Sequence, residues 1–488
     1  MAKKFRPEIF LGLVAPVGID LNYICGLMND YLAKKFKYKP YTIRLSSLIQ
    51  NINGVETIID DSSEYSRIDT GMRAGNEARF ISNQKDILAK HSIVEIQNIR
   101  ISPKPKQGSA YIFRSIKNPH EALLYRTVYG KGFFLLGFYS SRKNKERYLT
   151  GRQGMSKTSA NYLIGRDEEE SDKYGQQTRN TFYTSDVFFD IDSKNFQDHL
   201  KRFFDLIFCN PYITPTKDEF AMFLAFTSSF RSGDLSRQIG AVVSSKEGEV
   251  IATGCNDVPK KGGGLYWSDD PNDKRDFVKG YDANEKIKNE IATKIVSKIK
   301  LEESKTKISE EKLRKILKES GLFDITEYGR AVHAEMEALS TCSRIGISPR
   351  EGTIYSTTFP CHNCAKHIVA SGITRVVFVE PYPKSKALRL HDDSIEIKKE
   401  STNHETKVVF EVFIGVGPRR FIDLFSLKLS NGVKIIRKQK GKTIKWSEQE
   451  ATFRFPLVGM SYLDKEISIG AKLNIRGKNG KKKKEKEK

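Results

Sequence analysis

The N-terminal part of the chain alternates short apolar runs with an amphipathic segment. The spacing of residues 21–36 is that of a helix with one apolar face. Buried strands are predicted at 9–17, 41–45, 111–113 and 133–139. Strands that alternate with helices are typical of a parallel sheet covered by helices. The pattern therefore predicts an α/β domain over residues 1–210.

A second domain is expected to begin at residue 216. The prolines at 211 and 215 stiffen the chain immediately before a new amphipathic segment, as in a linker. A helix at 219–230 and a hairpin of strands at 238–243 and 250–254 follow it. We predict a sheet between layers of helices up to residue 425, followed by a C-terminal extension at 426–488.

Residues 258–328 interrupt the second domain with a Gly-rich loop and a helical insert. Four isoleucines at a spacing of four residues form one stripe: Ile287, Ile291, Ile295 and Ile299. Such a stripe packs on the domain's own core or forms an interface between subunits, and the pattern leaves both open.

Composition indicates the cellular compartment of the protein and the kind of partner that it binds. The chain has 488 residues, six cysteines and a net charge of +23. Six cysteines are too few for a disulfide scaffold, and no apolar run reaches the 18 or so residues of a membrane helix, so we expect a cytoplasmic protein. The charge favours free nucleotides and nucleic acid alike. The basic tail at 477–488 is expected to be solvated and disordered, with contact to a polyanion as the alternative.

One motif carries recognisable chemistry. Residues 333–335 are His-Ala-Glu, and residues 360–364 are Pro-Cys-His-Asn-Cys, which together form the signature of zinc deaminases. No neighbouring Cys-x-x-Cys or His-x-x-x-His supplies the fourth ligand of a structural site. We therefore predict Zn²⁺ bound by His333, Cys361 and Cys364, with one position open for water.

The signature also predicts a mechanism. Zinc lowers the pKa of its water to about 7, which supplies a nucleophile for C4 of cytosine or C6 of adenine. Glu335 is expected to carry the proton to the ring nitrogen and to the leaving ammonia. His333 and Cys361 each stand at the start of a predicted helix, whose dipole favours the thiolate. His362 and His367 are the alternative fourth ligands, and we expect His362 to point away.

From residue 231 to residue 382 the sequence resembles the deoxycytidylate deaminases of the cytidine deaminase-like superfamily. Three segments follow the order of that family: Gly-Asp-Leu-Ser-Arg-Gln-Ile-Gly-Ala at 233–241, Gly-Cys-Asn at 254–256 and His-Ala-Glu-Met at 333–336. The resemblance implies that Asn256 hydrogen-bonds the sugar or base and that Ser236 and Arg237 lie near the phosphate. Glu337 stands where these enzymes usually have asparagine, and the small enzymes lack the insert.

The longer architecture resembles the bacterial anti-phage deoxycytidine-nucleotide deaminases. Residues 10–20, 72–79, 111–126 and 413–425 carry this likeness. It implies an N-terminal domain like a degenerate P-loop nucleoside-monophosphate kinase, followed by a deaminase that converts dCTP or dCMP to the uracil nucleotide and starves phage replication. We expect a homo-oligomer, and a nucleotide or a small RNA is a candidate regulator.

The segment 12–20 lies between a predicted strand and a predicted helix, where a phosphate-binding loop belongs. Gly12 and Gly18 would let backbone N–H groups approach a phosphate. Ile19 and Asp20 replace the expected Lys-Ser/Thr, which removes an ammonium group and adds a repelling charge. We therefore expect a nucleotide sensor or a purely structural domain in preference to an active kinase.

Three functions remain open from the sequence. The first is zinc-dependent deamination of free deoxycytidine nucleotides. The second is deamination of cytosine or adenine within RNA or single-stranded DNA, which requires stacking aromatic residues, and Tyr266 and Trp267 are the obvious pair. The third is a nucleotide- or RNA-sensing regulator with a repurposed site, which the intact ligand set and Glu335 disfavour.

Overall fold

The protein forms two compact units in the computed structural model. One unit contains Met1–Pro215 and Ile414–Lys488, and the other contains Thr216–Phe413. The described residues are 6–100, 106–168, 170, 174–302, 308–325, 327–382, 385–398, 406–429, 434–457 and 461–473. Within these ranges, no helix has the length and apolar character needed to cross a membrane. The basic tail at 477–488 lies outside the described residues.

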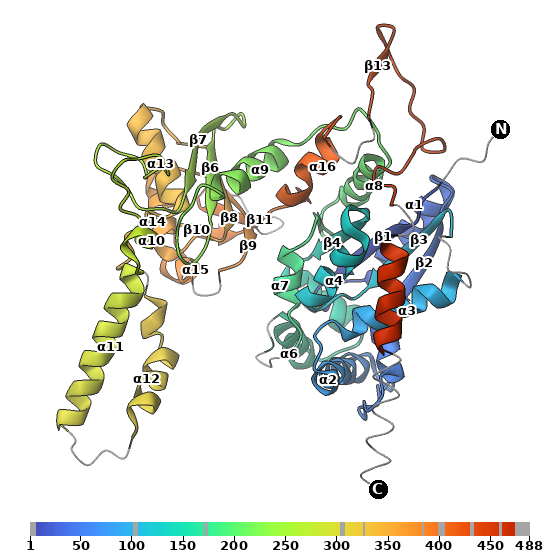
Figure 1. Ribbon diagram of the computed structural model, residues 1–488, viewed down its shortest axis with the longest axis horizontal. Coiled ribbons are helices and arrows are strands. Elements are labelled where there is room, and N and C mark those ends of the chain that lie inside the picture. The colour runs from blue at the N-terminus through green and yellow to red at the C-terminus, as the bar shows by residue number, and fades with distance from the viewer. Residues whose placement is uncertain are drawn as a thin grey trace. The chain divides into compact units, whose positions relative to one another are not determined.

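The first unit is built on a six-stranded sheet in the order β12-β5-β4-β1-β3-β2, of which Figure 1 labels β4, β1, β3 and β2. The strands are β1 (Ile9–Val14), β2 (Lys39–Arg44), β3 (Ser109–Arg114), β4 (Phe133–Tyr139), β5 (Val187–Asp190) and β12 (Gly415–Val416). The first five run parallel. The predicted strand pattern of this domain is therefore confirmed. Because β1 lies between β3 and β4, the connections diverge to either side of its carboxyl end, where parallel sheets commonly bind ligands.

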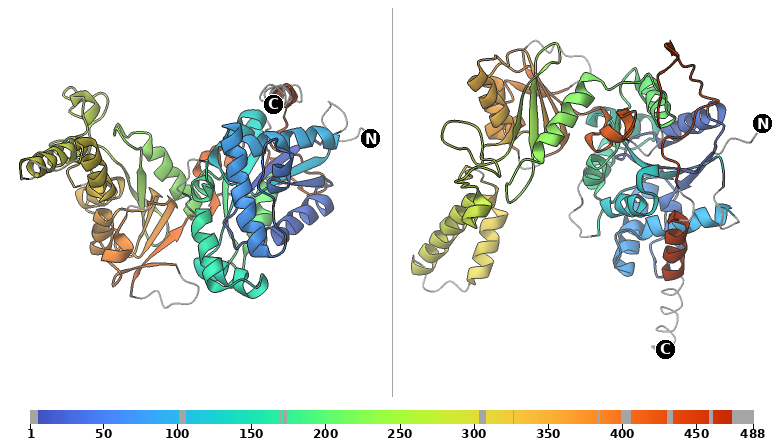
Figure 2. Two further views of the ribbon diagram at one scale, coloured as in Figure 1. Left: turned by 90° about the horizontal axis from the view of Figure 1, so that it is seen from below. Right: turned by 45° about the horizontal axis from the view of Figure 1, so that its top comes forward.

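Helices pack around this sheet (Figure 2). They are α1 (Leu21–Lys34), α2 (Glu64–Ser82), α3 (Ile87–Arg100), α4 (Pro119–Tyr129), α5 (Arg142–Arg147), α6 (Lys157–Glu168), α7 (Thr178–Tyr183) and α8 (Phe196–Ile207). The apolar side of α1 and the phenylalanines of α8 join the buried strands in one core. This core accounts for the alternation of apolar runs and amphipathic segments in the sequence.

The C-terminal segment belongs to the first unit, whereas the sequence placed residues 414–425 in the second domain. Strand β12 pairs antiparallel with β5. Phe453 and Phe455 enter the core of the first unit, and the hydroxyl of Tyr462 donates to Glu8 Oε2 at 2.7 Å. The helix α16 (Phe421–Phe425) and the small hairpin of β13 (Lys438–Gln439) and β14 (Lys442–Thr443) also lie in this segment. The C-terminal segment therefore belongs to the first unit because it is buried against the sheet formed by residues 9–190.

The second unit contains another six-stranded sheet, in the order β10-β11-β9-β8-β6-β7. Its strands are β6 (Gly240–Ser244), β7 (Val250–Cys255), β8 (Thr353–Thr358), β9 (Arg375–Glu380), β10 (Ile395–Ile397) and β11 (Val408–Val412). Strands β6 and β7 form the predicted antiparallel hairpin, while β8, β9, β11 and β10 run parallel. The division between the units falls at the end of the predicted linker.

Helices cover both faces of this second sheet. They are α9 (Lys217–Ser229), α13 (Ala334–Ile345), α14 (His362–Ala370) and the short α15 (Ala387–Leu390). The missing Cβ of Gly240 faces α9, and that of Gly254 faces α13. Gly254 pairs with Ala241, the residue after Gly240, so the two glycines face opposite sides of the sheet. The second unit thus has the predicted layers of helix, sheet and helix.

The insert forms a helical hairpin (Figure 2). It contains the short α10 (Asp276–Lys279), the long α11 (Ala283–Glu302) and α12 (Glu310–Glu319). The four isoleucines of the predicted stripe are all half-buried, and the fully buried positions of α11 are Ala283, Lys288, Ala292 and Val296. The buried face of α11 is therefore displaced by one residue from the predicted stripe of isoleucines.

Candidate metal centre and its cavity

The first ligand candidate is positioned by a close contact between a helix and a strand. His333 is the residue before α13, with extended backbone at φ −71° and ψ 154°. An added Cβ at Gly254 in β7 would lie 2.2 Å from the carbonyl oxygen of Ala334 and 2.6 Å from the amide nitrogen of Ala338. Only glycine allows this approach, so Gly254 sets how closely the first turn of α13 rests on the sheet.

The two cysteines come from the start of a second helix. Cys361 caps α14, and its sulfur accepts a hydrogen bond from the amide of Cys364 at 3.4 Å. His333 Nδ1 lies 3.3 Å from the sulfur of each cysteine. The ligand atoms of all three residues lie within 4.8 Å of one another. The structure therefore gathers the three predicted ligands from two helix N-termini.

The three ligand groups of this cluster differ in their protonation near neutral pH. A hydrogen bond from Cys364, together with the neighbouring His333, lowers the pKa of Cys361 to about 4. A hydrogen bond to Cys361 raises the pKa of His333 to about 9. The pKa of Cys364 is raised by its hydrogen bond to Cys361 and by burial. One thiolate is thus already present near neutrality, and a cation would release the remaining protons.

Glu335 lies beside the cluster without being one of its three members. Its side chain is buried, with 4% of the residue exposed. Ser356 donates a hydrogen bond to Oε1 at 3.0 Å, and Cys364 Sγ lies 3.3 Å from Oε2. Burial raises the pKa of the carboxyl group. A buried carboxyl group with a raised pKa, held by the Ser356 hydroxyl, is suited to accept and return a proton near neutral pH.

The donor set fits zinc. Two sulfurs and one imidazole nitrogen are ligands that Zn²⁺ prefers, and three protein ligands leave a fourth position open. Among the residues that the structure describes, no further His, Cys, Asp or Glu completes this group. His362 directs Nε2 towards Glu327 at 3.4 Å, and His367 is exposed. Neither alternative fourth ligand joins the cluster.

A cavity of about 340 Å³ adjoins the cluster. His333, Glu335 and Cys361 line it together with the predicted substrate residues Ser236, Arg237 and Asn256. The Asn256 amide accepts from the Ile239 amide at 2.7 Å and donates to the Arg237 carbonyl at 2.8 Å. Asn256 therefore holds the loop that carries Arg237. The Arg237 guanidinium lies 5.9 Å from the ring centre of Tyr382, which also lines the cavity.

The insert also contributes to this cavity, which the sequence did not predict. Asn284 and Lys288 of α11 line it, as does Phe323 in the turn after α12. Lys288 is buried and donates to the carbonyl of Phe323 at 3.0 Å. No sequence pattern marks a lysine as pocket-lining, because the insert reaches the cavity only through the tertiary fold.

The two glycines of the predicted phosphate loop have different places in the first unit. Gly12 lies inside β1, where an added Cβ would be 2.6 Å from Ile116 and 2.7 Å from Phe133. It permits tight packing within the sheet and is not part of the loop. Gly18 does lie in the loop, with φ +93°, against the backbone of Lys145.

Comparison with known proteins identifies a domain of a known class. Residues 215–380 match the family model for the cytidine and deoxycytidylate deaminase zinc-binding region. The second unit therefore contains a cytidine and deoxycytidylate deaminase-family domain, whose cofactor is zinc, and the His/Cys/Cys cluster has the donor set for that ion.

Individual relatives are similar over short stretches. ComE operon protein 2 of Bacillus subtilis is 42% identical over 53 residues, which is 11% of this chain and 28% of that protein. Deoxycytidylate deaminase of Enterobacteria phage T2 is 44% identical over 55 residues, 11% of this chain and 29% of that protein. The chain thus spans less than a third of the length of either relative. The dCMP deaminase of cyanophage S-TIM5, solved in apo form and with dCMP and dUMP, is 16% identical, covers 41% of this chain and all of its own, and has a TM-score of 0.23.

Proposed function

We propose that the second unit hydrolyses the amino group of deoxycytidine nucleotides, with Zn²⁺ held by His333, Cys361 and Cys364. The products are a deoxyuridine nucleotide and ammonia. The observation that carries the proposal is the buried Glu335 carboxyl group, fixed beside the ligand cluster at the wall of a cavity. The deaminase-family match and relatives named deoxycytidylate deaminase support the same chemistry.

Glu335 and Ser356 have separate roles in the proposed reaction. Zinc, when bound, supplies a water molecule of lowered pKa as the nucleophile. Glu335 accepts a proton from that water and delivers it to N3 of the cytosine ring, and then carries the second proton to the departing amine. Ser356 keeps Oε1 in place through its hydrogen bond of 3.0 Å. Glu335 is buried away from bulk water, and this burial raises the pKa of its carboxyl group. A raised pKa lets the carboxyl group both accept the proton of the water and donate it to the substrate.

The cavity favours a free nucleotide over a polymer. Its volume of about 340 Å³ lies within the range of small-molecule pockets. Trp267 is half-exposed and stacks its ring 3.5 Å from the Arg231 guanidinium, and it is not among the cavity's lining residues. Arg237 forms no ion pair with a carboxylate in the described part of the chain, which leaves its charge for a substrate phosphate. We propose dCMP, dCTP or both as substrates.

The wider role follows from the resemblance to the anti-phage enzymes. We propose that the first unit is kinase-like, which its parallel sheet and its loop between β1 and α1 support. On this view the chain acts in the cytoplasm as a homo-oligomer and limits phage replication by depleting dCTP. A test is the dCTP pool of infected cells that express the native chain or its Glu335→Gln variant. A lower pool with the native chain supports the role, and equal pools contradict it.

The activity itself is tested with a panel of substrates. Ammonia release and uracil formation are measured with dCMP, dCTP, CMP, CTP and single-stranded DNA, before and after removal of metal by a chelator. Conversion of dCMP or dCTP that is lost on chelation and restored by Zn²⁺ supports the proposal. Conversion of the polymer alone would replace it with polynucleotide deamination, and no conversion of any substrate would refute a deaminase.

A further inference from the structure

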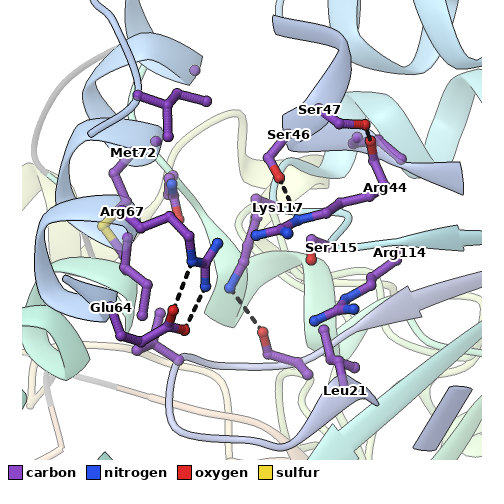
Figure 3. Close-up of a pocket in the computed structure, with 18 of the residues that line it drawn as sticks. Leu21, Arg44, Ser46, Ser47, Glu64, Arg67, Met72, Arg114, Ser115 and Lys117 are labelled. Carbon is purple, nitrogen blue, oxygen red and sulfur yellow. Dashed lines mark hydrogen bonds and ion pairs between the residues drawn. The ribbon is translucent and has the colours of Figure 1, made fainter. Parts of the chain in front are cut away.

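Cations of the first unit occur in two contrasting settings. Those that line a cavity of about 680 Å³ at the carboxyl ends of β2 and β3 have partners within the chain (Figure 3). Arg67 donates from Nε to Glu64 Oε2 at 2.7 Å. Arg44, which pairs with Arg114 in the strand register, donates from Nε to the hydroxyl of Ser46 at 2.9 Å. A second group of cations lies near the C-terminal end of the unit and lacks such partners.

This second group makes the hairpin of β13 and β14 strongly basic, and Figure 1 shows the hairpin extending from the first unit. Residues 434–446 contain no aspartate or glutamate. Six of these residues are exposed cations: Lys434, Arg437, Lys438, Lys440, Lys442 and Lys445. None of the six forms an ion pair with a carboxylate in the described part of the chain. Like charges on adjacent strands repel one another, so a polyanion bound here would relieve an unfavourable concentration of charge.

The base of the hairpin is fixed to the first unit. The hydroxyl of Tyr212 donates to the carbonyl oxygen of Ile444 at 2.6 Å and lies 3.1 Å from that of Arg437. Trp446 donates from Nε1 to the carbonyl oxygen of Phe208 at 3.2 Å, and it packs against the core of the unit. These contacts hold both arms of the hairpin in place, so a partner would not have to order a loose basic loop on binding.

The lysines of the hairpin face in different directions. Residues 440 and 441 both have positive φ, at +48° and +79°, as in a tight two-residue turn. Lys438 pairs with Thr443, and Gln439 pairs with Lys442. Directly paired residues share one face of a hairpin, and successive residues alternate between the faces. The lysines at 438 and 442 therefore lie on opposite faces, and the turn places a third lysine at the tip between them.

This placement of cations fits a groove. A membrane surface would contact one face of the hairpin, whereas phosphates line both walls of a groove in duplex nucleic acid. The major groove of B-DNA is about 12 Å wide and admits a two-stranded β-ribbon. The major groove of double-stranded RNA is deep and narrow, and side chains cannot read it. The geometry therefore favours DNA.

We propose that residues 434–446 form a binding surface for double-stranded DNA, with the hairpin in the major groove. Lys438 and Lys442 contact the phosphates on the two walls of the groove. Lys440 faces the floor of the groove, where guanine N7 and O6 accept hydrogen bonds. The binding surface shares no residue with the deaminase cavity, and it does not rest on the proposed function of the second unit.

The test measures binding of the zinc-loaded full chain to a fluorescent DNA duplex of about 20 base pairs, by anisotropy between about 50 and 200 mM salt. The native chain is expected to bind with a Kd of about 1–100 μM at physiological salt, as for contacts to the DNA backbone. Lys438→Gln combined with Lys442→Gln should weaken binding at least about tenfold. It should also reduce the slope of log K against log salt concentration by about 2, one for each lost phosphate contact.

Lys143→Gln combined with Lys194→Gln is the matched control, because it removes the same charge from two exposed lysines outside the hairpin. The control should bind the duplex like the native chain. Native binding by the hairpin variant would overturn the proposal, as would equal weakening by the control, which would leave net charge alone as the cause. No binding of the duplex at about 50 mM salt would also overturn it, and the lysines would then only protect exposed strand edges from pairing.

Two competitors separate DNA from other polyanions. They are a double-stranded RNA of the same sequence and vesicles of phosphatidylglycerol and phosphatidylcholine in equal parts. Both are expected to displace the DNA less effectively than unlabelled duplex at the same phosphate concentration. RNA that competes as well as DNA would overturn the assignment to DNA, and vesicles that do so would replace the groove with a lipid surface.

A second measurement does not depend on folding of the variants. Lysine acetylation of the native chain is mapped by mass spectrometry with and without the DNA duplex. The bound duplex should protect Lys438 and Lys442 and leave Lys143 and Lys194 reactive. Unchanged acetylation of both hairpin lysines at saturating duplex would contradict the proposal. Neither experiment uses deamination, so failure here leaves the proposed function of the second unit untouched.

Discussion

Gly254→Ala should displace the helix that carries the proposed zinc ligand His333. The new Cβ would lie 2.2 Å from the carbonyl oxygen of Ala334, more than 1 Å inside the ordinary contact distance of 3.4 Å. Both atoms near the Cβ belong to the backbone of α13, so the first turn of the helix has to move away from β7. Zinc sites tolerate errors of about 0.2 Å in ligand distance. A shift of about 1 Å exceeds that tolerance several-fold.

We therefore expect Gly254→Ala to lose most of its zinc and about 1–3 kcal/mol of stability, as in an overpacked core. Metal content is measured by elemental analysis and stability by denaturant unfolding. Gly26→Ala is the control, because that glycine lies within α1 and an added Cβ meets nothing within 4 Å. It should keep one zinc per chain. Full zinc content and native stability in Gly254→Ala would refute this account of the helix position.

Three further predictions concern the site, its substrate and pH. Ser356→Ala removes the hydrogen bond to Glu335 Oε1 and should lower kcat about 10- to 100-fold at unchanged zinc content, in line with about 1.5–3 kcal/mol for such bonds; an unchanged kcat would show that the bond is dispensable. Arg237→Gln should raise KM for dCMP about tenfold without raising it for deoxycytidine, because only the nucleotide carries a phosphate; equal changes for both would contradict a phosphate contact. Burial raises the pKa of Asp205 from 3.8 to about 6, so its ionised form destabilises the fold above that pH and the penalty disappears as the pH falls below about 4. Asp205→Asn should therefore stabilise the protein by about 1–3 kcal/mol at pH 8 and by nothing at pH 4 in denaturant unfolding, whereas a gain that is independent of pH would contradict the assignment.

Local signals in the sequence were sufficient to predict the group of metal-ligand candidates and most of the strands. His333, Cys361 and Cys364 were predicted as one group because the signature fixes both residue types and spacing, and the structure brings their ligand atoms within 4.8 Å. The apolar run at 133–139 became β4 with the predicted bounds. In both cases the information lies in neighbouring residues, which is what a sequence pattern records.

Features that depend on distant contacts could not be predicted. Phe453 and Phe455 show that the C-terminal segment is apolar, but no local pattern tells which sheet they join. The pairing of Arg44 with Arg114 follows from strand register across 70 residues of sequence. Gly12 was assigned to the phosphate loop although the predicted strand at 9–17 contains it, because the sequence does not show that Ile116 and Phe133 pack against it within the sheet. Register and packing, which come from the assembled core, decide all three.

The most direct test of the central claim is dCMP turnover by Glu335→Gln, measured on protein whose zinc content is known. Glu337→Gln is the matched control, because Glu337 lies on the same helix, is also buried and pairs with Arg344 at 2.7 Å. We predict that Glu335→Gln retains one zinc per chain and forms no detectable dUMP, while Glu337→Gln remains active. Native turnover by zinc-loaded Glu335→Gln would contradict the assignment of Glu335 as the proton carrier and the deaminase mechanism built on it.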